Sequence, residues 1–514
     1  MIDPPEDLGR TPEPEPGSGQ LLGSGSEPDV ATEADLATEA DVATGAKRGR
    51  LRAAVALTLV AAIVIFGALG GARLVHVSDN DQPPATHPPR LAAVDANGAL
   101  ATMDGVGGSV VPYPVPDVAF EFPVWSPDGT HLAAIGRSQA GVGVYVFAAP
   151  ANGAKRGDGT TDAASAAATT DGDPAVIYQS ADRAPFYLYW APDSRRLAFL
   201  ATEPAGISLR IAPADGSAAD AVVRQGAPLY WDWVDPARLL AHIGGDAPDA
   251  FLGEFAVDGA SGDASGNAPS LTSTLGAFRS PAVSRDGRYR AFVEATADST
   301  QQLVVEARDG SNNHTLAVAG ATALGFDPTG TSLAYVAPDS SDTQPPTLPI
   351  GPLRLVDATS GVSRLLLGGK VVAFFWAPDG KTIATLGVAG PGNDGVQAAT
   401  TQVVPAVARL AAPRTLRPEA IGAAAGVGVH LAFIDVATAA IRAQQDVRIS
   451  DLFTNQVLPF FDQYALSHRF WSADGTAIAL PLVAADGTDQ LVVIPADGSA
   501  SHSIADRVIG FWSP

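Results

Sequence analysis

The sequence of 514 residues contains no cysteine and only two methionines. The lack of cysteine excludes disulfides, thiolate metal sites and a cysteine nucleophile anywhere in this sequence. It also contains no Gly-x-Ser-x-Gly phrase, which excludes the nucleophile elbow of an α/β-hydrolase. P-loops and dinucleotide-binding glycine fingerprints are missing as well. The sequence therefore predicts no cofactor, and it offers no motif for catalysis.

Basic residues are also scarce. Lysine and arginine number 32 against 55 aspartates and glutamates, which gives a formal net charge of −23. Binding to nucleic acid requires a cationic surface that neutralises phosphates, so this balance excludes nucleic acid as a partner. An excess of one charge is instead typical of a self-repelling, well-solvated surface.

Residues 1–46 form an acidic segment with eleven aspartates and glutamates and a single basic residue, Arg10. Proline, glycine, serine and alanine make up most of the remainder. Such a segment buries too little apolar surface to offset the entropy of ordering it. It is predicted to be a disordered cytoplasmic tail, and we interpret it as a solvated spacer rather than a docking arm.

Residues 47–76 comprise a basic flank followed by an apolar run. The run, residues 53–72, contains twenty residues without a charge, enough for about 30 Å of helix, the thickness of a hydrocarbon core. Four basic residues precede it, which places the N-terminus in the cytoplasm. A signal peptide has a similar pattern, but its apolar core is shorter, and here 52 residues come before the run. We predict an uncleaved single-pass anchor in the cell membrane, a proline-rich linker at 77–89 and an extracytoplasmic domain at 90–514.

One short phrase recurs through residues 90–514: an aromatic residue, a Pro-Asp-Gly-like turn and an apolar run. The clearest copies are WSPDGTHLAAI from Trp125, WAPDSRRLAFL from Trp190, WAPDGKTIATL from Trp376 and WSADGTAIALP from Trp471. Weaker copies begin at Trp233, Val283 and Phe326. Asp-Gly favours a tight hairpin because glycine accepts a positive φ and aspartate bonds to nearby backbone. Repeats of this length with several short strands predict an all-β fold, the β-propeller.

The two ends of this region are each incomplete. Residues 90–116 can form three outer strands but lack an aromatic phrase, whereas Val508–Trp512 is an aromatic strand with nothing after it. Pairing them would close the ring and hide both edges. Counted in this way there are eight blades, with seven as the alternative. The interval of 95 residues between Trp376 and Trp471 is read as one blade with an insertion at 390–428.

The phrase W-[SA]-P-D-G-x-x-[LI]-A, followed by a strand that ends in Asp-Gly, resembles the TolB-type propeller repeat, a relative of the WD40-like families. The resemblance covers about residues 90–514. It implies the fold and leaves the function open, because propellers of this kind include scaffolds and peptidase-associated domains. TolB has an additional α/β domain before its propeller, whereas this chain has the predicted anchor there.

The recurrent aspartates of the phrase suggest a metal ring at first sight, but their place in a hairpin turn predicts a structural role. They are Asp128, Asp193, Asp286, Asp379 and Asp474. The aromatic residues are predicted to pack between blades. His131 and His242 are predicted to be packed residues rather than metal ligands, and no metal site is predicted.

Two insertions remain as candidates for function, residues 149–173 and 390–428. The second contains Arg409, Arg414 and Arg417, three arginines within nine residues of an otherwise acidic chain. Insertions in repeat folds often gather on the binding face, so these arginines are a candidate docking patch for a protein or anionic ligand.

The sequence thus favours a binding or scaffold module for envelope proteins, a polymer or a small ligand. The alternative is a hydrolase or lyase whose site lies at the mouth of the channel. Clustered histidine, glutamate and arginine side chains at the channel would favour the enzyme, and a closed, apolar channel would favour the binding module.

Overall fold

The computed structural model describes residues 89–149, 173–204, 206–244, 250–257, 270–272, 274–298, 300–339, 348–388 and 426–514. The predicted tail, the anchor at 53–72 and Arg409, Arg414 and Arg417 lie outside these residues. Everything described belongs to one unit of the chain, Ala56–Pro514. Among the described residues, no helix has the length and apolar character needed to cross a bilayer.

Three sheets of this unit each contain four antiparallel strands that follow one another along the chain. The first consists of β4 (Ala119–Trp125), β5 (His131–Ser138), β6 (Gly141–Ala148) and β7 (Ala175–Ser180). The second consists of β8 (Pro185–Trp190), β9 (Arg196–Glu203), β10 (Gly206–Pro213) and β11 (Ala221–Gly226). The third consists of β15 (Ala282–Val283), β16 (Tyr289–Ala295), β17 (Gln301–Ala307) and β18 (Asn313–Val318). The all-β fold expected from the repeat is thus confirmed.

Another sheet joins the two ends of the described chain. It contains β29 (Ile509–Trp512), β1 (Arg90–Val94), β2 (Leu100–Asp104) and β3 (Val111–Pro112), in that order. β29 runs antiparallel to β1, with Leu91 opposite Trp512 and Val94 opposite Ile509. This is the pairing expected from the two incomplete ends, and β29 covers the inner edge of β1.

Two further sheets complete the described strands. One has three strands, β12 (Leu229–Asp235), β13 (Arg238–Ile243) and β14 (Phe251–Ala256). The other has ten, β19 (Ala323–Phe326), β20 (Ser332–Val336), β21 (Gly351–Asp357), β22 (Ser363–Trp376), β23 (Thr382–Val388), β24 (Val427–Asp435), β25 (Ile441–Ile449), β26 (Ala477–Val483), β27 (Asp489–Pro495) and β28 (His502–Ile504). β23 pairs directly with β24, so the expected insertion connects neighbouring strands of one sheet; it ends slightly earlier than predicted, before Val427.

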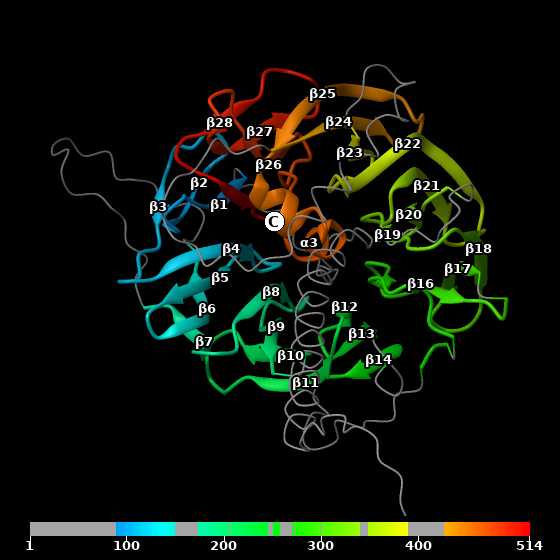
Figure 1. Cartoon of the computed structure of the whole chain (residues 1–514), viewed down its shortest axis with the longest axis horizontal. Coiled ribbons are helices and arrows are strands. Elements are labelled where there is room, and N and C mark those ends of the chain that lie inside the picture. The colour runs from blue at the N-terminus through cyan, green and yellow to red at the C-terminus, as the bar shows by residue number, and fades with distance from the viewer. Residues whose placement is uncertain are drawn as a thin grey trace, which may run out of the picture. The chain divides into compact units, whose positions relative to one another are not determined.

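The sheets follow one another around a common centre, with their first strands innermost (Figure 1). These inner strands lie against each other from sheet to sheet: β29 contacts β4, β4 contacts β8, and β12 contacts β15, which contacts β19. This radial arrangement of small antiparallel sheets is a β-propeller.

The aspartates of the repeated phrase lie in the turns, as predicted. Asp128 Oδ1 accepts hydrogen bonds from the Ser126 hydroxyl at 2.6 Å and from the Thr130 backbone at 3.0 Å. Asp474 repeats this geometry with Ser472 and Thr476. Burial by itself would raise the pKa of Asp128, but these hydrogen bonds lower it overall. Each carboxylate therefore stabilises its own hairpin.

The tryptophans of the phrase connect successive copies of the repeat through a hydrogen bond that the sequence does not reveal. In four copies the indole Nε1 donates to a backbone carbonyl of the preceding copy, always that of the residue just before its aromatic residue. The pairs are Trp125 to Phe511, Trp190 to Val124, Trp376 to Gly325 and Trp471 to Phe375, at 3.0 to 3.2 Å. The tryptophans are therefore packing residues that also fix each copy of the repeat to the one before it.

This hydrogen bond can be tested with a matched pair of substitutions. Trp471 and Trp512 are equally buried, but Trp512 Nε1 has no hydrogen-bond partner among the described residues. Both Trp→Phe changes remove similar volume, whereas only Trp471→Phe loses a hydrogen bond. We expect Trp471→Phe to lower the free energy of unfolding by about 1 kcal/mol more than Trp512→Phe, measured by chemical denaturation. Equal losses would show that the indole bond contributes nothing.

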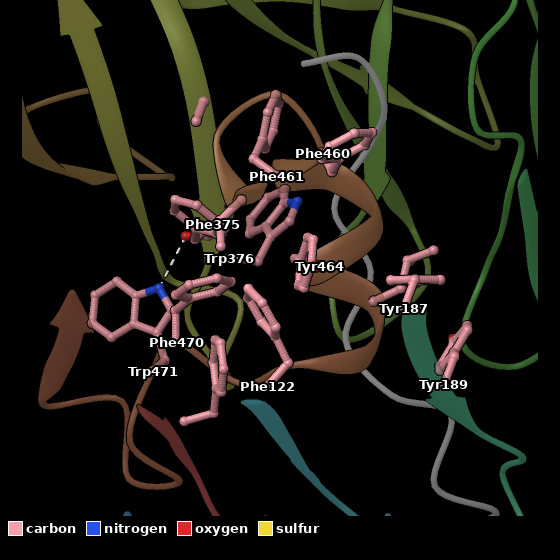
Figure 2. Close-up of a cluster of buried hydrophobic side chains, with 14 of the residues drawn as sticks. Phe122, Tyr187, Tyr189, Phe375, Trp376, Phe460, Phe461, Tyr464, Phe470 and Trp471 are labelled. Atoms are coloured by element: carbon pink, nitrogen blue, oxygen red, sulfur yellow. Dashed lines mark hydrogen bonds between the residues drawn. The ribbon is translucent and has the colours of Figure 1, made fainter. Parts of the chain in front are cut away.

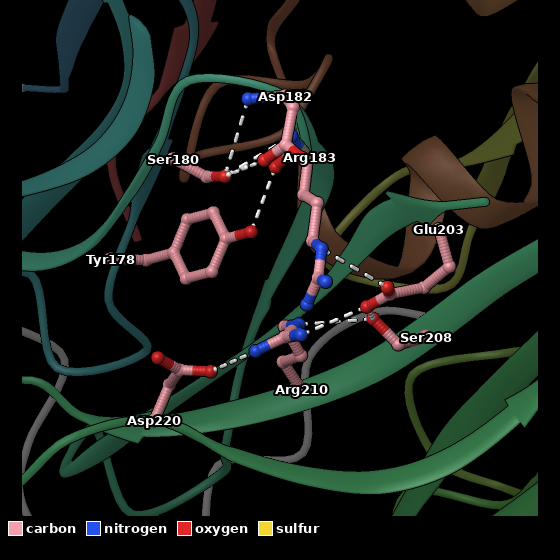
Figure 3. A network of polar contacts seen from close by, with 8 residues as sticks. All are labelled: Tyr178, Ser180, Asp182, Arg183, Glu203, Ser208, Arg210 and Asp220. Carbon is pink, nitrogen blue, oxygen red and sulfur yellow. Dashed lines mark hydrogen bonds and ion pairs between the residues drawn. The ribbon is translucent and has the colours of Figure 1, made fainter. Parts of the chain in front are cut away.

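A cluster of ion pairs around Arg210 also contacts the neighbouring sheet through a cation–π interaction (Figure 3). Arg210 on β10 binds Asp220 at 2.6 Å and Glu203 at 2.8 Å, and its guanidinium lies 5.3 Å from the ring centre of Tyr178 on β7. Hydrogen bonding from Arg210 lowers the pKa of Glu203. Arg183 also binds Glu203 at 3.4 Å, so two arginines balance the two carboxylates and we interpret the cluster as a structural link.

A helical segment between β25 and β26 occupies the centre of the ring (Figure 1). It consists of the π-helical turn η1 (Phe453–Val457) and the helix α3 (Phe461–Ser467). α3 contacts β8, β19 and β22, which belong to two different sheets. In the copy of the phrase that follows, Trp471 forms only an isolated β-bridge with Ile478, where a full inner strand was expected. The chain enters the channel here instead of extending along the sheet.

Candidate functional site

Aromatic side chains around α3 fill the centre of the ring. Phe461 packs against Phe374 and Phe375 with ring centres 5.6 and 6.0 Å apart. On another side, Phe470 packs against Phe375 and against Phe511 of β29. Figure 2 shows this cluster around the helix. The channel is thus closed at this level by apolar contacts from several sheets.

Beside α3 a cavity of about 300 Å³ remains open. Its walls come from three consecutive sheets and from the helical segment. The strands contribute Glu121, Phe122, Ile135, Arg137, Pro185, Phe186, Tyr187, Leu200, Thr202, Ile207, Leu229 and Tyr230, the loops contribute Ala184 and Pro228, and the helical segment contributes Asn455, Gln456, Phe460, Gln463 and Tyr464. Most of this surface is apolar, as is usual for a ligand site.

Two wall residues have an unusual backbone. Phe122 has φ 46° and Tyr187 has φ 49°, in the left-handed region that bulky side chains rarely adopt. Both lie at bulges, where the register of β4 against β5 and of β8 against β9 shifts. Such a conformation costs about 1 to 3 kcal/mol and persists only where neighbouring contacts enforce it. Strain of this kind concentrates at functional sites, so two instances in one cavity indicate a site.

The contacts that hold these two residues come from α3. The ring of Tyr464 lies 5.5 Å from Phe122 and 5.6 Å from Tyr187, measured between centres. The Tyr187 hydroxyl donates to the backbone carbonyl of Gln463 at 2.7 Å. In Figure 2, Phe122 and Tyr187 lie on different sides of Tyr464. The bulges thus turn two aromatic rings out of their strands and onto the helix.

A buried amide is one of the polar groups in the wall of the cavity. Gln463 lines the cavity and is only 2% exposed, and its Nε2 has no hydrogen-bond partner among the described residues. A buried polar group without a partner costs about 1 to 3 kcal/mol, which a ligand that accepts its hydrogen bond would recover. Burial, aided by the charge of Glu121, raises the pKa of Tyr464, so its hydroxyl stays protonated. The deep part of the cavity therefore presents uncharged hydrogen-bonding groups.

The mouth of the cavity is charged. Arg137 Nε binds Glu121 Oε1 at 3.1 Å, and the two side chains are 55% and 41% exposed. The half-buried Asn455 and the exposed Gln456 also face the cavity. Because the arginine and the glutamate pair with each other, neither presents an unbalanced charge to the interior.

A titratable group lies next to the buried amide. Asp462 is fully buried, and its Oδ1 accepts a hydrogen bond from the Gln463 backbone at 2.9 Å. Burial raises the pKa of this carboxyl to about 8, although the nearby Arg279 opposes the rise. The burial that raises this pKa disfavours the charged carboxylate at the apolar centre of the ring.

The structure places the predicted site residues as follows. His242 is buried, and its Nδ1 lies 2.8 Å from the backbone carbonyl oxygen of Arg279, so it is a packed residue as predicted. His131 lies 6.1 Å from Trp190, measured between ring centres. No group of three or more His, Cys, Asp or Glu side chains in the described part of the chain could hold a metal ion. Arg409, Arg414 and Arg417 lie outside that part.

The residues that line the cavity were not predicted from the sequence. One signal was available: Val457, Phe460, Phe461 and Tyr464 recur at helical spacing, which differs from the alternation of the strands. The bulges at Phe122 and Tyr187 gave no comparable signal.

No protein-family model matches the sequence, and no curated protein matches it. Solved structures with some likeness include an oligogalacturonate lyase in complex with manganese, with 12% identity over 81% of this chain and 84% of that one, at a TM-score of 0.40. An oligogalacturonate lyase from Vibrio parahaemolyticus matches with 10% identity, 81% and 84% coverage and a TM-score of 0.36. TolB from Acinetobacter baumannii matches with 14% identity over 54% of this chain and 62% of its own, less than two thirds, at a TM-score of 0.31. Likenesses at this level assign no function to the chain.

Proposed function

We propose that this protein is a binding module whose propeller holds a ligand in the cavity beside α3. The observation that carries the proposal is the pair of strained aromatic residues, Phe122 and Tyr187, that flank an open cavity lined by Gln463, whose Nε2 has no hydrogen-bond partner among the described residues. Conformational strain and an unpaired buried donor both cost stability. A ligand that fills the cavity and accepts the hydrogen bond would offset the cost of the unpaired donor, whereas Tyr464 already holds the two strained residues in place.

Binding fits the site better than catalysis does. The walls are mainly apolar, and the charged pair at the mouth, Glu121 and Arg137, is internally balanced. A general acid or base requires a titratable group directed at the substrate. The centre of the ring is closed and aromatic, and a closed, apolar channel is the arrangement expected of a binding or scaffold module.

The proposal includes the architecture predicted from the sequence. The ten-stranded sheet divides into three blades if β22 and β25 are counted as strands shared between neighbours, which gives eight blades in total. Residues 53–72 would anchor the chain in the membrane, with the N-terminus in the cytoplasm and the propeller outside. The patch of Arg409, Arg414 and Arg417 would add a docking surface for a protein or anionic partner.

Filling the cavity tests the binding function. Ala184 lines the cavity and is half-buried, so Ala184→Phe should place a ring inside it. Ala256, exposed at the end of β14, provides Ala256→Phe as the control. A mixed set of neutral, anionic and cationic compounds is screened by thermal shift on the purified full chain. A ligand at 100 times its Kd stabilises by about 2.7 kcal/mol, and we expect this in the native chain and the control but not in Ala184→Phe. Failure to find any compound with this pattern would refute the proposal.

Topology is tested with reporters. A reporter fused after Pro514 should behave as exported, and one inserted at residue 40 should behave as cytoplasmic, because Lys47, Arg48, Arg50 and Arg52 favour the cytoplasmic side. Changing these four residues to alanine should give mixed orientations. A cytoplasmic C-terminal reporter in the native chain would contradict the predicted orientation.

A further inference from the structure

We infer that the ligand of this cavity is a small, uncharged aromatic molecule that carries a hydrogen-bond acceptor. The inference rests on the proposed binding function and specifies the chemistry that the cavity selects. It follows from the charges, the wall composition and the position of the buried amide.

The charges of the cavity argue against a charged ligand. Among the described residues, the charged side chains that line it are Glu121 and Arg137, and their ion pair lies at the exposed mouth. Burying an unpaired charge against apolar walls is strongly unfavourable. The net charge of −23 adds a long-range repulsion against anions. A ligand that reaches the deep part of the cavity is therefore neutral.

The walls of the cavity favour a flat aromatic body. Six rings line it, those of Phe122, Phe186, Tyr187, Tyr230, Phe460 and Tyr464. Aromatic rings attract each other in edge-to-face and offset geometries beyond the effect of buried area. The volume of about 300 Å³ lies at the lower end of the range of ligand pockets, about 300 to 1,000 Å³. A cavity of this volume suits a single aromatic ring or two fused rings better than a large cofactor.

The buried amide defines the polar part of the ligand. Gln463 Nε2 lacks a partner among the described residues, and the backbone around it is fixed by the hydrogen bond that Tyr187 donates to the Gln463 carbonyl. A carbonyl oxygen on the ligand would satisfy this donor. A ligand with the same rings but no acceptor would leave the donor unpaired.

Calorimetry on the purified full chain tests this chemistry with three matched probes. 2-Naphthamide is neutral and has a hydrogen-bond acceptor, naphthalene lacks the acceptor, and 2-naphthoate is an anion. We expect 2-naphthamide to bind roughly fivefold more tightly than naphthalene. It should bind more than about tenfold more tightly than 2-naphthoate. Gln463→Leu should remove the preference for the amide over naphthalene. The exposed Gln225→Leu on β11 serves as the control and should keep the preference. If Gln463→Leu fails to fold, Gln463→Met, which preserves the side-chain length, replaces it.

The outcomes separate the two proposals. Tighter binding of 2-naphthoate that is abolished by Ala184→Phe would overturn the ligand class and leave the binding function standing. An amide preference that survives Gln463→Leu would overturn the role of this residue. Absence of binding by all three probes at millimolar concentration would also overturn the ligand class, and the cavity-filling screen would then decide the function by itself.

Discussion

Deleting Val508–Pro514 is expected to abolish cooperative folding of the propeller. These residues include β29, the innermost strand of its sheet, and their loss exposes the whole inner edge of β1. Phe511 is 1% exposed and packs against Phe470, and its carbonyl accepts the indole hydrogen bond of Trp125. Removing two buried aromatic side chains and an isoleucine costs of order 10 kcal/mol. That is comparable to the stability of a typical domain, about 5 to 15 kcal/mol.

Thermal unfolding followed by circular dichroism measures this effect. The control is deletion of residues 1–46, which are predicted to contribute almost nothing to the stability of the fold. Similar melting temperatures for the full chain and the chain without Val508–Pro514 would show that the ring does not depend on its closing strand.

Phe461→Ala is expected to lower the free energy of unfolding by about 3 to 5 kcal/mol. Phe461 is fully buried in α3 and lies against Phe374 and Phe375 at the centre of the ring, so truncation leaves a cavity that neighbouring strands cannot fill. Chemical denaturation provides the measurement. Phe251→Ala, at a partly exposed position on β14, should cost distinctly less. A loss below about 1 kcal/mol for Phe461→Ala would mean that α3 is not an integral part of the core.

The repeated phrase predicted the hairpins of the blades well because its information is local. A Pro-Asp-Gly turn encodes its own hairpin, and the hydrogen bonds of Asp128 and Asp474 lie within five residues. The pairing of β29 with β1 could also be expected, because each segment lacked a partner within its own repeat.

The centre of the ring could not be predicted in the same way. The segment with η1 and α3 interrupts the repeat, and its helical pattern is too short to stand out against the neighbouring strands. The cavity depends on the backbone at Phe122 and Tyr187, where a positive φ opposes the preference of the residue type. Only the three-dimensional contact with Tyr464 makes this conformation tolerable, and no local pattern in the sequence records that contact.

The pairing of β29 with β1 has a consequence for biosynthesis. Arg90 and Ser513, which are hydrogen-bonded at this junction, are separated by 423 residues. At a translation rate of about 5 to 20 residues per second, β1 would wait roughly 20 to 80 s for its partner strand. During that time the ribosome-bound chain exposes an unpaired strand edge of the apolar sequence RLAAV. The nascent chain is therefore vulnerable to aggregation at β1 until β29 has been synthesised and can pair with it.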